Sequence, residues 1–155
     1  MKTRQQIDPW LEPFLECVRG HGSTGPFLLC LPEYRPDLAR TVADVLGCEF
    51  FDYRAEVMAP LGWQAHELSL DDLDDVLKQR ADIGSVAAFN IEALLATKSA
   101  VERRGWLERF VETSYSAMVV IPLSIYVDDA PVGLGRVTFV DSRLPEQSFL
   151  NRLAL

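Results

Sequence analysis

The chain has 155 residues, of which 48% are hydrophobic and 25% are charged. This length and this balance suit a single globular domain with a sizeable core, and they exclude a disordered chain. The formal net charge of -8 at pH 7 repels a phosphate backbone, which argues against direct nucleic-acid binding.

The first predicted element is a helix over residues 7–19, because apolar side chains recur there at helical spacing. They are Ile7, Trp10, Leu11, Phe14, Leu15 and Val18. Pro13 lies inside this pattern, so the helix either kinks there or begins there. The segment 20–25 then matches GxGxxG, but it follows a helix and precedes a strand, which is the reverse of the dinucleotide-binding context. We therefore interpret it as a connector.

The organising unit of the fold is predicted directly after this connector. An apolar strand over 27–31 is followed by a short polar loop and an amphipathic helix over 37–46. Pro36 suits the first turn of that helix, and Gly47 suits its end. A short aromatic strand over 49–52 follows, so the unit runs strand, loop, helix, strand.

The rest of the chain alternates predicted helices and strands after an irregular connection at 53–66. The predicted elements are a helix at 69–79 capped by Ser69, a strand at 85–89, a polar strand end followed by a short helix within 90–96, a helix at 99–112 capped by Ser99, and a strand at 117–121 that Pro122 ends. The predicted C-terminal elements are a hairpin of 123–127 with 136–140 and a short helix from Pro145 that bears Phe149, Leu150 and Leu153.

This βα alternation predicts an α/β fold in three layers (αβα), with a mainly parallel sheet between two layers of helices. No repeat or low-complexity linker interrupts it, so we expect one domain over 1–155. Its expected parts are the N-terminal helix 7–19, a core over 27–124, and a C-terminal hairpin and helix over 125–155.

Cysteine usage and the N-terminus indicate the cellular compartment. The three cysteines, Cys17, Cys30 and Cys48, form no CxxC pair and lie among apolar neighbours, as buried thiols in a reducing cytosol do. The N-terminal residues lack the apolar core of a signal peptide, and no apolar run approaches the length of a membrane span. We therefore expect a cytoplasmic protein that does not bind membranes.

The order of these elements and their pattern of apolar and polar residues resemble the core of P-loop NTPases of the AAA type. In the resemblance, which covers 27–124, the strand 27–31 leads into the phosphate loop and 117–121 lies where the sensor strand runs. The segment 86–95, with its Asn-Ile-Glu-Ala-Leu-Leu run, resembles the Walker B strand and its continuation. More narrowly, the chain is similar to small NTPase-like components of bacterial phage-exclusion systems of the BREX type. The resemblance implies a P-loop NTPase-like fold in a bacterial protein of phage defence.

The phosphate-loop position lacks the chemistry that this family needs. Glycines, a lysine and a Ser/Thr hydroxyl would hold the phosphates and Mg²⁺ there. This chain instead has Glu33, Tyr34, Arg35 and Asp37, interspersed with two prolines that remove backbone donors. Glu33 would repel a triphosphate, and Asp37 replaces the metal-binding hydroxyl. Arg35 is a single cation and does not replace the missing set.

The Walker B position is altered as well. Phe89 stands where the metal-holding aspartate belongs, and Asn90 follows it. Glu92 survives at the place of the acid that positions water, although a lone glutamate after a strand is more often a cap or an ion-pair partner. We therefore expect no metal, no cofactor and no catalytic residue of the P-loop kind.

These departures predict a catalytically inactive NTPase-like domain that serves as a protein-interaction or accessory subunit of a larger cytoplasmic assembly. The candidate contact residues are large, mostly apolar side chains in irregular segments, namely Tyr34, Met58, Leu61 and Trp63. The expected partner is another protein, and an oligomer of the chain itself is compatible with the same features.

Two alternatives stay open. In the first, the chain is a small α/β enzyme or a nucleotide-binding protein that uses Glu92 and Asp52 as paired carboxylates at the C-terminal edge of the sheet. In the second, the acidic stretch 67–82 imitates nucleic-acid charge and blocks a basic partner, although helix capping also explains those carboxylates.

Overall fold

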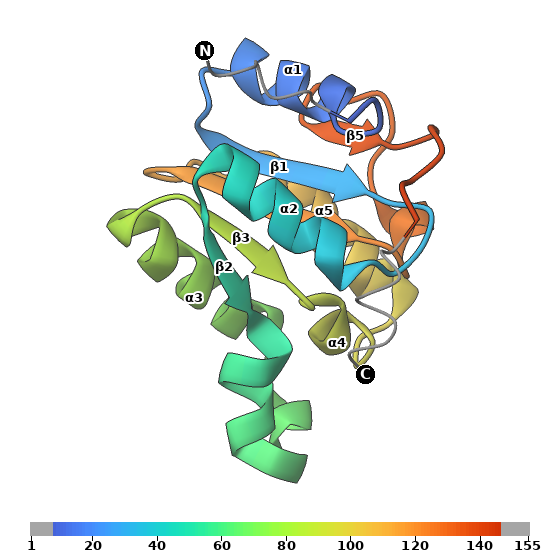
Figure 1. Cartoon of the computed structure of the whole chain (residues 1–155). Coiled ribbons are helices and arrows are strands. Elements are labelled where there is room, and N and C mark those ends of the chain that lie inside the picture. Colours follow the sequence, from blue (N-terminus) through green and yellow to red (C-terminus); the bar gives the residue numbers. More distant parts are fainter. Residues whose placement is uncertain (1–7, 147–155) are drawn as a thin grey trace.

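The computed structural model describes residues 8–146, which form one five-stranded sheet flanked by helices (Figure 1). Every strand pair is parallel, and the spatial order of the strands is β2-β3-β4-β1-β5. The strands are β1 (Gly25–Cys30), β2 (Glu49–Asp52), β3 (Val86–Phe89), β4 (Met118–Leu123) and β5 (Val137–Phe139). The predicted α/β fold with a parallel sheet is confirmed.

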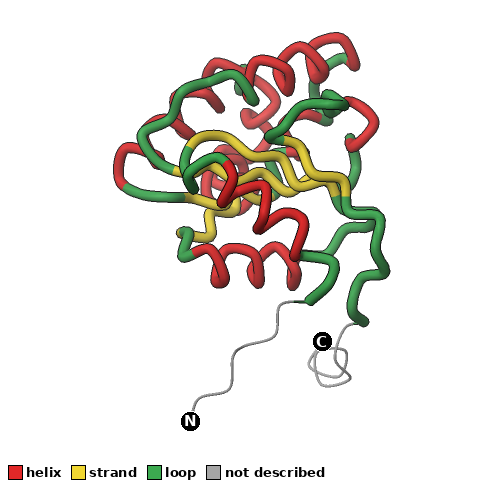
Figure 2. Tube along the Cα trace, turned by 90° about the horizontal axis from the view of Figure 1, so that it is seen from above, coloured by secondary structure: helices red, strands yellow, loops and turns green. Residues whose placement is uncertain are grey.

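Helices cover both faces of the sheet, which gives three layers (Figure 2). The helices are α1 (Glu12–Gly20), α2 (Pro36–Leu46), α3 (Leu70–Ile83), α4 (Glu92–Leu95) and α5 (Ala100–Phe110). Phe14 of α1 and Val42 of α2 belong to the core cluster on one face. Leu77 of α3 and Trp106 of α5 belong to the cluster on the opposite face, together with side chains of α4.

β1 is buried along its whole length, because it lies between β4 and β5 and under helices on both sides. Phe27 and Leu29 join the cluster of α1 and α2, whereas Leu28 and Cys30 join the cluster of α3 and α5. Alternate side chains of a strand point to opposite faces, so a strand covered on both faces is apolar throughout. This pattern is what made the strand predictable.

Local capping signals fix the helix ends. Ser69 and Ser99 each accept a hydrogen bond from a backbone N–H of the first turn, and Asp72 and Glu102 return the bond as the second half of a capping box. Gly47 ends α2 with φ 71°, in the left-handed region that favours glycine.

The N-terminal helix is shorter than the predicted span of 7–19. α1 begins at Glu12 with Pro13 in its first turn, so the proline starts the helix and does not kink it. Trp10 and Leu11 lie in the preceding turn and are each only 2% exposed. Ile7 lies outside the described residues.

The predicted C-terminal hairpin is wrong, because β5 pairs in parallel with β1 and not with the segment 123–127. A hairpin would need the backbone N–H groups that follow β4 for its ladder. Those of Ser124, Ile125 and Tyr126 instead donate to the Glu92 carboxylate. The chain then turns through η3 (Val127–Asp129) and returns to the other end of the sheet. From there β5 runs parallel to β1 along its free edge. The predicted helix bearing Phe149, Leu150 and Leu153 lies outside the described residues.

Pro122 does not end its strand, which continues to Leu123. The Leu123 carbonyl accepts from Leu31 N–H, so Leu123 bonds toward β1 and its neighbour Pro122 faces the β3 side. Pairing with β3 stops at Val120, so no ladder bond is missing at the proline.

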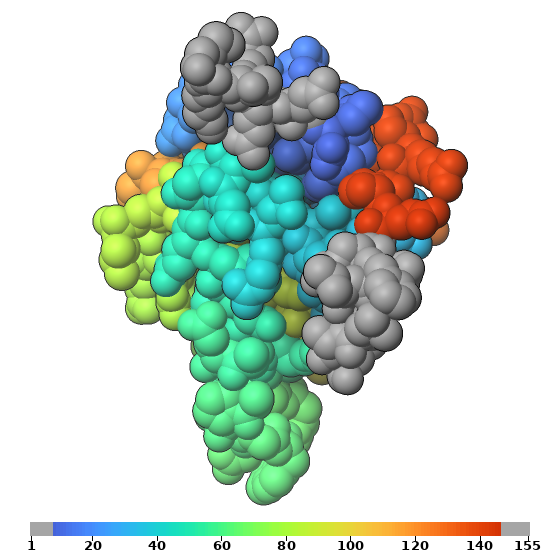
Figure 3. Space-filling model, in the orientation of Figure 1, coloured from blue at the N-terminus to red at the C-terminus, as the bar shows by residue number. Residues whose placement is uncertain are grey.

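A helical lobe, residues 54–67, follows the edge strand β2 and projects away from the body of the molecule (Figure 3). It consists of the π-helical turn η1 (Arg54–Met58) and the 3-10 segment η2 (Ala59–Glu67), which is interrupted by Gly62 at φ 61°. The predicted irregular connection at 53–66 is therefore wrong in its conformation. Within residues 8–146, no helix is both long enough and apolar enough to span a membrane.

Candidate functional site

The segments that resemble the phosphate loop, the Walker B strand and the sensor strand follow β1, β3 and β4. β4 lies between the other two strands, so the three segments emerge at one edge of the sheet from adjacent strands. Ligands of open parallel sheets bind beyond this C-terminal edge. This edge of the sheet is therefore the candidate functional site.

Arg35, in the loop after β1, is bound by the carboxylates of its own loop. Its side chain is only 7% exposed. Nε and Nη2 donate to the two oxygens of Asp37 over 3.0 and 2.8 Å, and Nη1 donates to Glu33 over 3.1 Å. The fork-like pairing with Asp37 is the strong geometry of a guanidinium with a carboxylate. The guanidinium of this loop is thus already paired within the chain.

Asp37 lies in the first turn of α2, where a helix favours an anion. The hydrogen bond from Arg35 and the Arg35 charge lower the pKa of Asp37, and the backbone N–H groups of Asp37 and Leu38 lower it further, against a smaller effect of burial. The chain thus supplies its own carboxylate at the helix end that holds a phosphate in P-loop proteins. Arg35 and Asp37 therefore do not fit the triphosphate of a nucleoside triphosphate.

Tyr34, Asn90 and Asp52 form a chain of hydrogen bonds across the sheet edge. The Tyr34 hydroxyl donates to Asn90 Oδ1 over 2.9 Å, and Asn90 Nδ2 donates to Asp52 Oδ1 over 3.0 Å. The Tyr34 ring also stacks on Phe89, with ring centroids 5.5 Å apart. Phe89, at the end of β3, therefore supports the loop after β1.

Glu92 is a buried carboxylate, 6% exposed, that binds the loop after β4. Its Oε1 accepts from Ser124 N–H over 3.1 Å, and its Oε2 accepts from the N–H groups of Ile125 and Tyr126, each over 2.7 Å. Both oxygens are engaged by backbone donors. Asp52 instead binds Asn90 and the N–H of Ala55, so the two candidate carboxylates have separate partners.

A pocket of about 290 Å³ opens beside these side chains. It is lined by Tyr34, Arg54, Asn90, Glu92, Ala93, Ala96, Ile125 and Tyr126. The sequence singled out only three of these residues, Tyr34, Asn90 and Glu92. Arg54, Ile125 and Tyr126 lie on segments that carry no recognisable motif, so no sequence signal pointed to them.

The four predicted contact residues differ in their surroundings. Trp63 is 76% exposed at the lobe and stacks on His66, and Leu61 is 39% exposed. Met58 is partly buried against the core cluster of α3 and α5. Tyr34 is 45% exposed, although its hydroxyl and ring are both engaged. The lobe thus presents two of the four side chains freely.

No protein-family model matches the chain, and no curated protein matches its sequence. Residues 8–146 contain no group of three or more His, Cys, Asp or Glu side chains placed to hold a metal ion. The function is therefore argued from the chain's own geometry.

Proposed function

We propose that the chain is a non-hydrolysing, NTPase-like domain that serves as a protein-interaction subunit, and that the lobe is its docking element. The observation that supports this most directly is Trp63, which is 76% exposed on a segment that projects from the sheet edge. Large aromatic side chains are the usual anchors of interfaces. An indole that is 76% exposed on a projecting element does not contribute to the core.

The tip of the lobe has the composition of a contact surface. Residues 57–66 contain no Asp, Glu, Lys or Arg in a chain with 38 such residues, 15 basic and 23 acidic. Leu61 lies two residues before Trp63. Of the η2 residues, only Ala65 is buried. Burying a tryptophan removes about 150–250 Å² from water, which corresponds to several kcal/mol at about 25 cal/mol per Å². A partner that covers this tip would gain that contribution.

The sheet edge supports the non-hydrolysing half of the proposal. A water-positioning acid must present a carboxylate lone pair to water, whereas Glu92 is only 6% exposed and accepts hydrogen bonds from three backbone N–H groups. A phosphate-binding loop must present backbone donors and a free cation, whereas Arg35 is paired with Asp37 and Glu33. The polar groups of this edge thus stabilise the fold.

The test is to mix the purified protein with the products of neighbouring genes and to measure the mass of the species in solution. The proposal expects a complex with one of them. The Trp63→Ala variant should weaken this complex by at least about 2 kcal/mol, or roughly thirtyfold, as removal of an interface anchor does. Ile83→Ser removes a comparably exposed apolar side chain, 86% exposed at the end of α3, and is the matched control.

Two results would overturn the proposal. A protein that stays monomeric with every neighbour would not be an interaction subunit. ATP hydrolysis that is lost in Glu92→Gln, with the unfolding free energy unchanged, would make Glu92 catalytic.

A second candidate is a ligand-binding protein that uses the 290 Å³ pocket. The observation in its favour is the position of this pocket at the C-terminal sheet edge, with the Asn90 amide and the Arg54 guanidinium among apolar walls. Nucleotide titration with and without Mg²⁺, measured by calorimetry or fluorescence, distinguishes this candidate from the protein-interaction subunit. Saturable binding that is lost in Asn90→Ala would favour the ligand-binding protein.

A further inference from the structure

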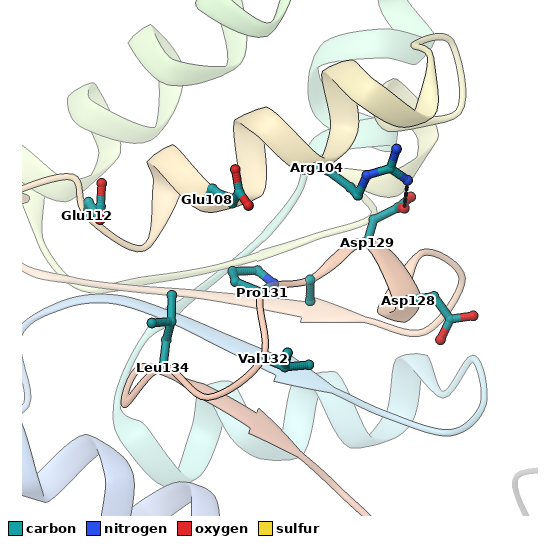
Figure 4. A pocket seen from close by; sticks show the side chains of 9 residues that line it. Arg104, Glu108, Glu112, Asp128, Asp129, Pro131, Val132 and Leu134 are labelled. Carbon is teal, nitrogen blue, oxygen red and sulfur yellow. Dashed lines mark hydrogen bonds and ion pairs between the residues drawn. The ribbon is translucent and has the colours of Figure 1, made fainter.

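A further hollow lies away from the sheet edge and the lobe. It is a groove of about 570 Å³ between α5 and the loop that leads to β5 (Figure 4). It is lined by Arg104, Glu108, Glu112, Asp128, Asp129, Ala130, Pro131, Val132 and Leu134. This loop precedes β5, at one edge of the sheet, whereas the lobe follows β2, at the other edge. The groove and the lobe are therefore separate surfaces.

One wall of the groove is negatively charged. Glu108 lies in the last turn of α5, and Glu112 lies four residues on, in the turn that continues it. Like charges at this spacing repel, and a helix C-terminus adds negative potential of its own. Arg104, the cation of the groove, is paired with Asp129 over 3.3 Å. Within residues 8–146, neither glutamate forms an ion pair.

The opposite wall of the groove is apolar. Val132 is 78% exposed, Leu134 is 44% exposed, and Pro131 lies between them and the helix (Figure 4). Acidic side chains alone would be an ordinary solvated helix face. Exposed aliphatic side chains placed across from them make a groove of mixed character, which fits a segment that has apolar and cationic groups on one face.

We propose that this groove binds a cationic amphipathic segment of a partner protein, with Lys or Arg side chains against Glu108 and Glu112 and an apolar side chain against Val132 and Leu134. Charge complementarity selects the occupant. Arg103 and Arg104 both pair with Asp129, which leaves Glu108, Glu112 and Asp128 as the carboxylates of the lining without an ion pair within residues 8–146. The chain as a whole has a net charge of -8. This surface is distinct from the lobe, so the proposal does not depend on what the lobe binds. A chain with both surfaces bridges two partners.

The probe is a labelled synthetic peptide that forms an amphipathic helix, with Arg at positions i and i+4 and Leu on the same face. It is titrated with the full chain, and anisotropy is measured at low and at high salt. The proposal expects saturable binding that Glu108→Gln/Glu112→Gln weakens by about tenfold. Added salt should weaken the same binding, because the groove is open to screening by ions. Val132→Ser should weaken it independently.

Matched controls separate the groove from general charge attraction. Asp71→Asn/Asp75→Asn removes two exposed carboxylates at the same spacing on α3, and Val101→Ser removes a side chain that is 72% exposed on α5. Both controls should bind the peptide as the parent does. Equal losses in the control pair and the groove pair, or no saturable binding at low salt, would overturn the proposal. Circular dichroism verifies that each variant is folded.

The test also distinguishes this proposal from the proposed function. Trp63→Ala should leave peptide binding unchanged, and the groove variants should leave the complex made through the lobe unchanged. If the peptide does not bind while the complex through the lobe still forms, the groove proposal is refuted and the proposed function is unaffected.

Discussion

Replacing Glu92 by Gln tests whether this carboxylate holds the fold together. The substitution keeps the shape of the side chain and removes its charge. The carboxylate accepts hydrogen bonds from three consecutive backbone N–H groups, two of them over 2.7 Å. If the amide oxygen takes the position of Oε2, these two short bonds persist but become neutral, and the amide NH₂ then faces the N–H of Ser124.

The magnitude follows from the number of bonds affected. A hydrogen bond to a charged group contributes about 1.5–3 kcal/mol and a neutral one about 0.5–1.5 kcal/mol. Two bonds that become neutral therefore cost about 2 kcal/mol in unfolding free energy, and the weakened bond from Ser124 N–H makes this a lower bound. For a chain of this size this corresponds to a fall of about 4–8 °C in melting temperature. Glu92→Ala, which removes the partner of three backbone donors in a partly exposed loop, should cost about 3 kcal/mol.

The assay is urea unfolding followed by circular dichroism, with Glu108→Gln as the matched control because Glu108 lies on the exposed side of a helix. The control should change the unfolding free energy by less than about 0.5 kcal/mol. If Glu92→Gln unfolds with the same free energy as the parent, the charge of this carboxylate does not stabilise the loop. The structural role assigned to Glu92 would then be wrong.

Three further substitutions test other parts of the structure by the same assay. Asp37→Asn should cost about 2 kcal/mol at pH 7, because the buried guanidinium of Arg35 loses its bidentate partner. Since the native pKa of Asp37 is lowered, this difference is complete above about pH 4 and should disappear as the pH falls through that native pKa; a constant difference down to pH 2 would refute the ion pair. Burial raises the pKa of Asp74 against the hydrogen bond from Trp106 Nε1, so its ionisation opposes folding. Asp74→Asn, whose amide oxygen can keep that hydrogen bond, should therefore gain stability relative to the parent as the pH rises from acid to 7, and a relative loss over this range would contradict this. Gly25→Ala should cost about 2 kcal/mol, because φ is 89° and the new Cβ would lie 2.7 Å from Arg136 Nη1; Arg136→Ala in the same chain should recover part of that cost, and strictly additive costs would show that the two residues do not collide.

The sequence predicted those elements whose signals are local. The strand 49–52 has the predicted bounds, and both serine-capped helices begin where their caps indicated. The strand 27–31 was visible because a strand covered on both faces is apolar throughout. Hydrophobic periodicity and capping are encoded within a few residues of the element they define, so a single sequence suffices for them.

The hairpin and the lobe could not be predicted, because tertiary contacts decide both. The residues after β4 have the alternation of a strand, but the distant Glu92 holds their N–H groups, and β1 offers β5 a parallel neighbour. In the lobe, the sequence predicted an irregular connection, whereas the segment forms short turns of uncommon helix types. Such turns have no strong sequence signature.

The sequence predicted which segments meet at the C-terminal edge of the sheet, but not how their side chains bond to one another. The sequence placed Glu33, Arg35, Asn90 and Glu92 near one sheet edge, and the parallel topology brings their segments there. It could not show that Arg35 pairs with Asp37, or that Glu92 faces three backbone donors. Pairings of this kind depend on side-chain directions that only the packed structure defines.

The three tryptophans divide the molecule into three optically separate parts. Trp10 lies in the core under α1 and α2, Trp106 lies in the core on the other face of the sheet, and Trp63 stands in solvent. A soluble quencher reaches only the third indole while the chain is folded, whereas the other two become accessible on unfolding. Emission from single-tryptophan variants can therefore report separately on each side of the sheet and on contacts made by the projecting segment.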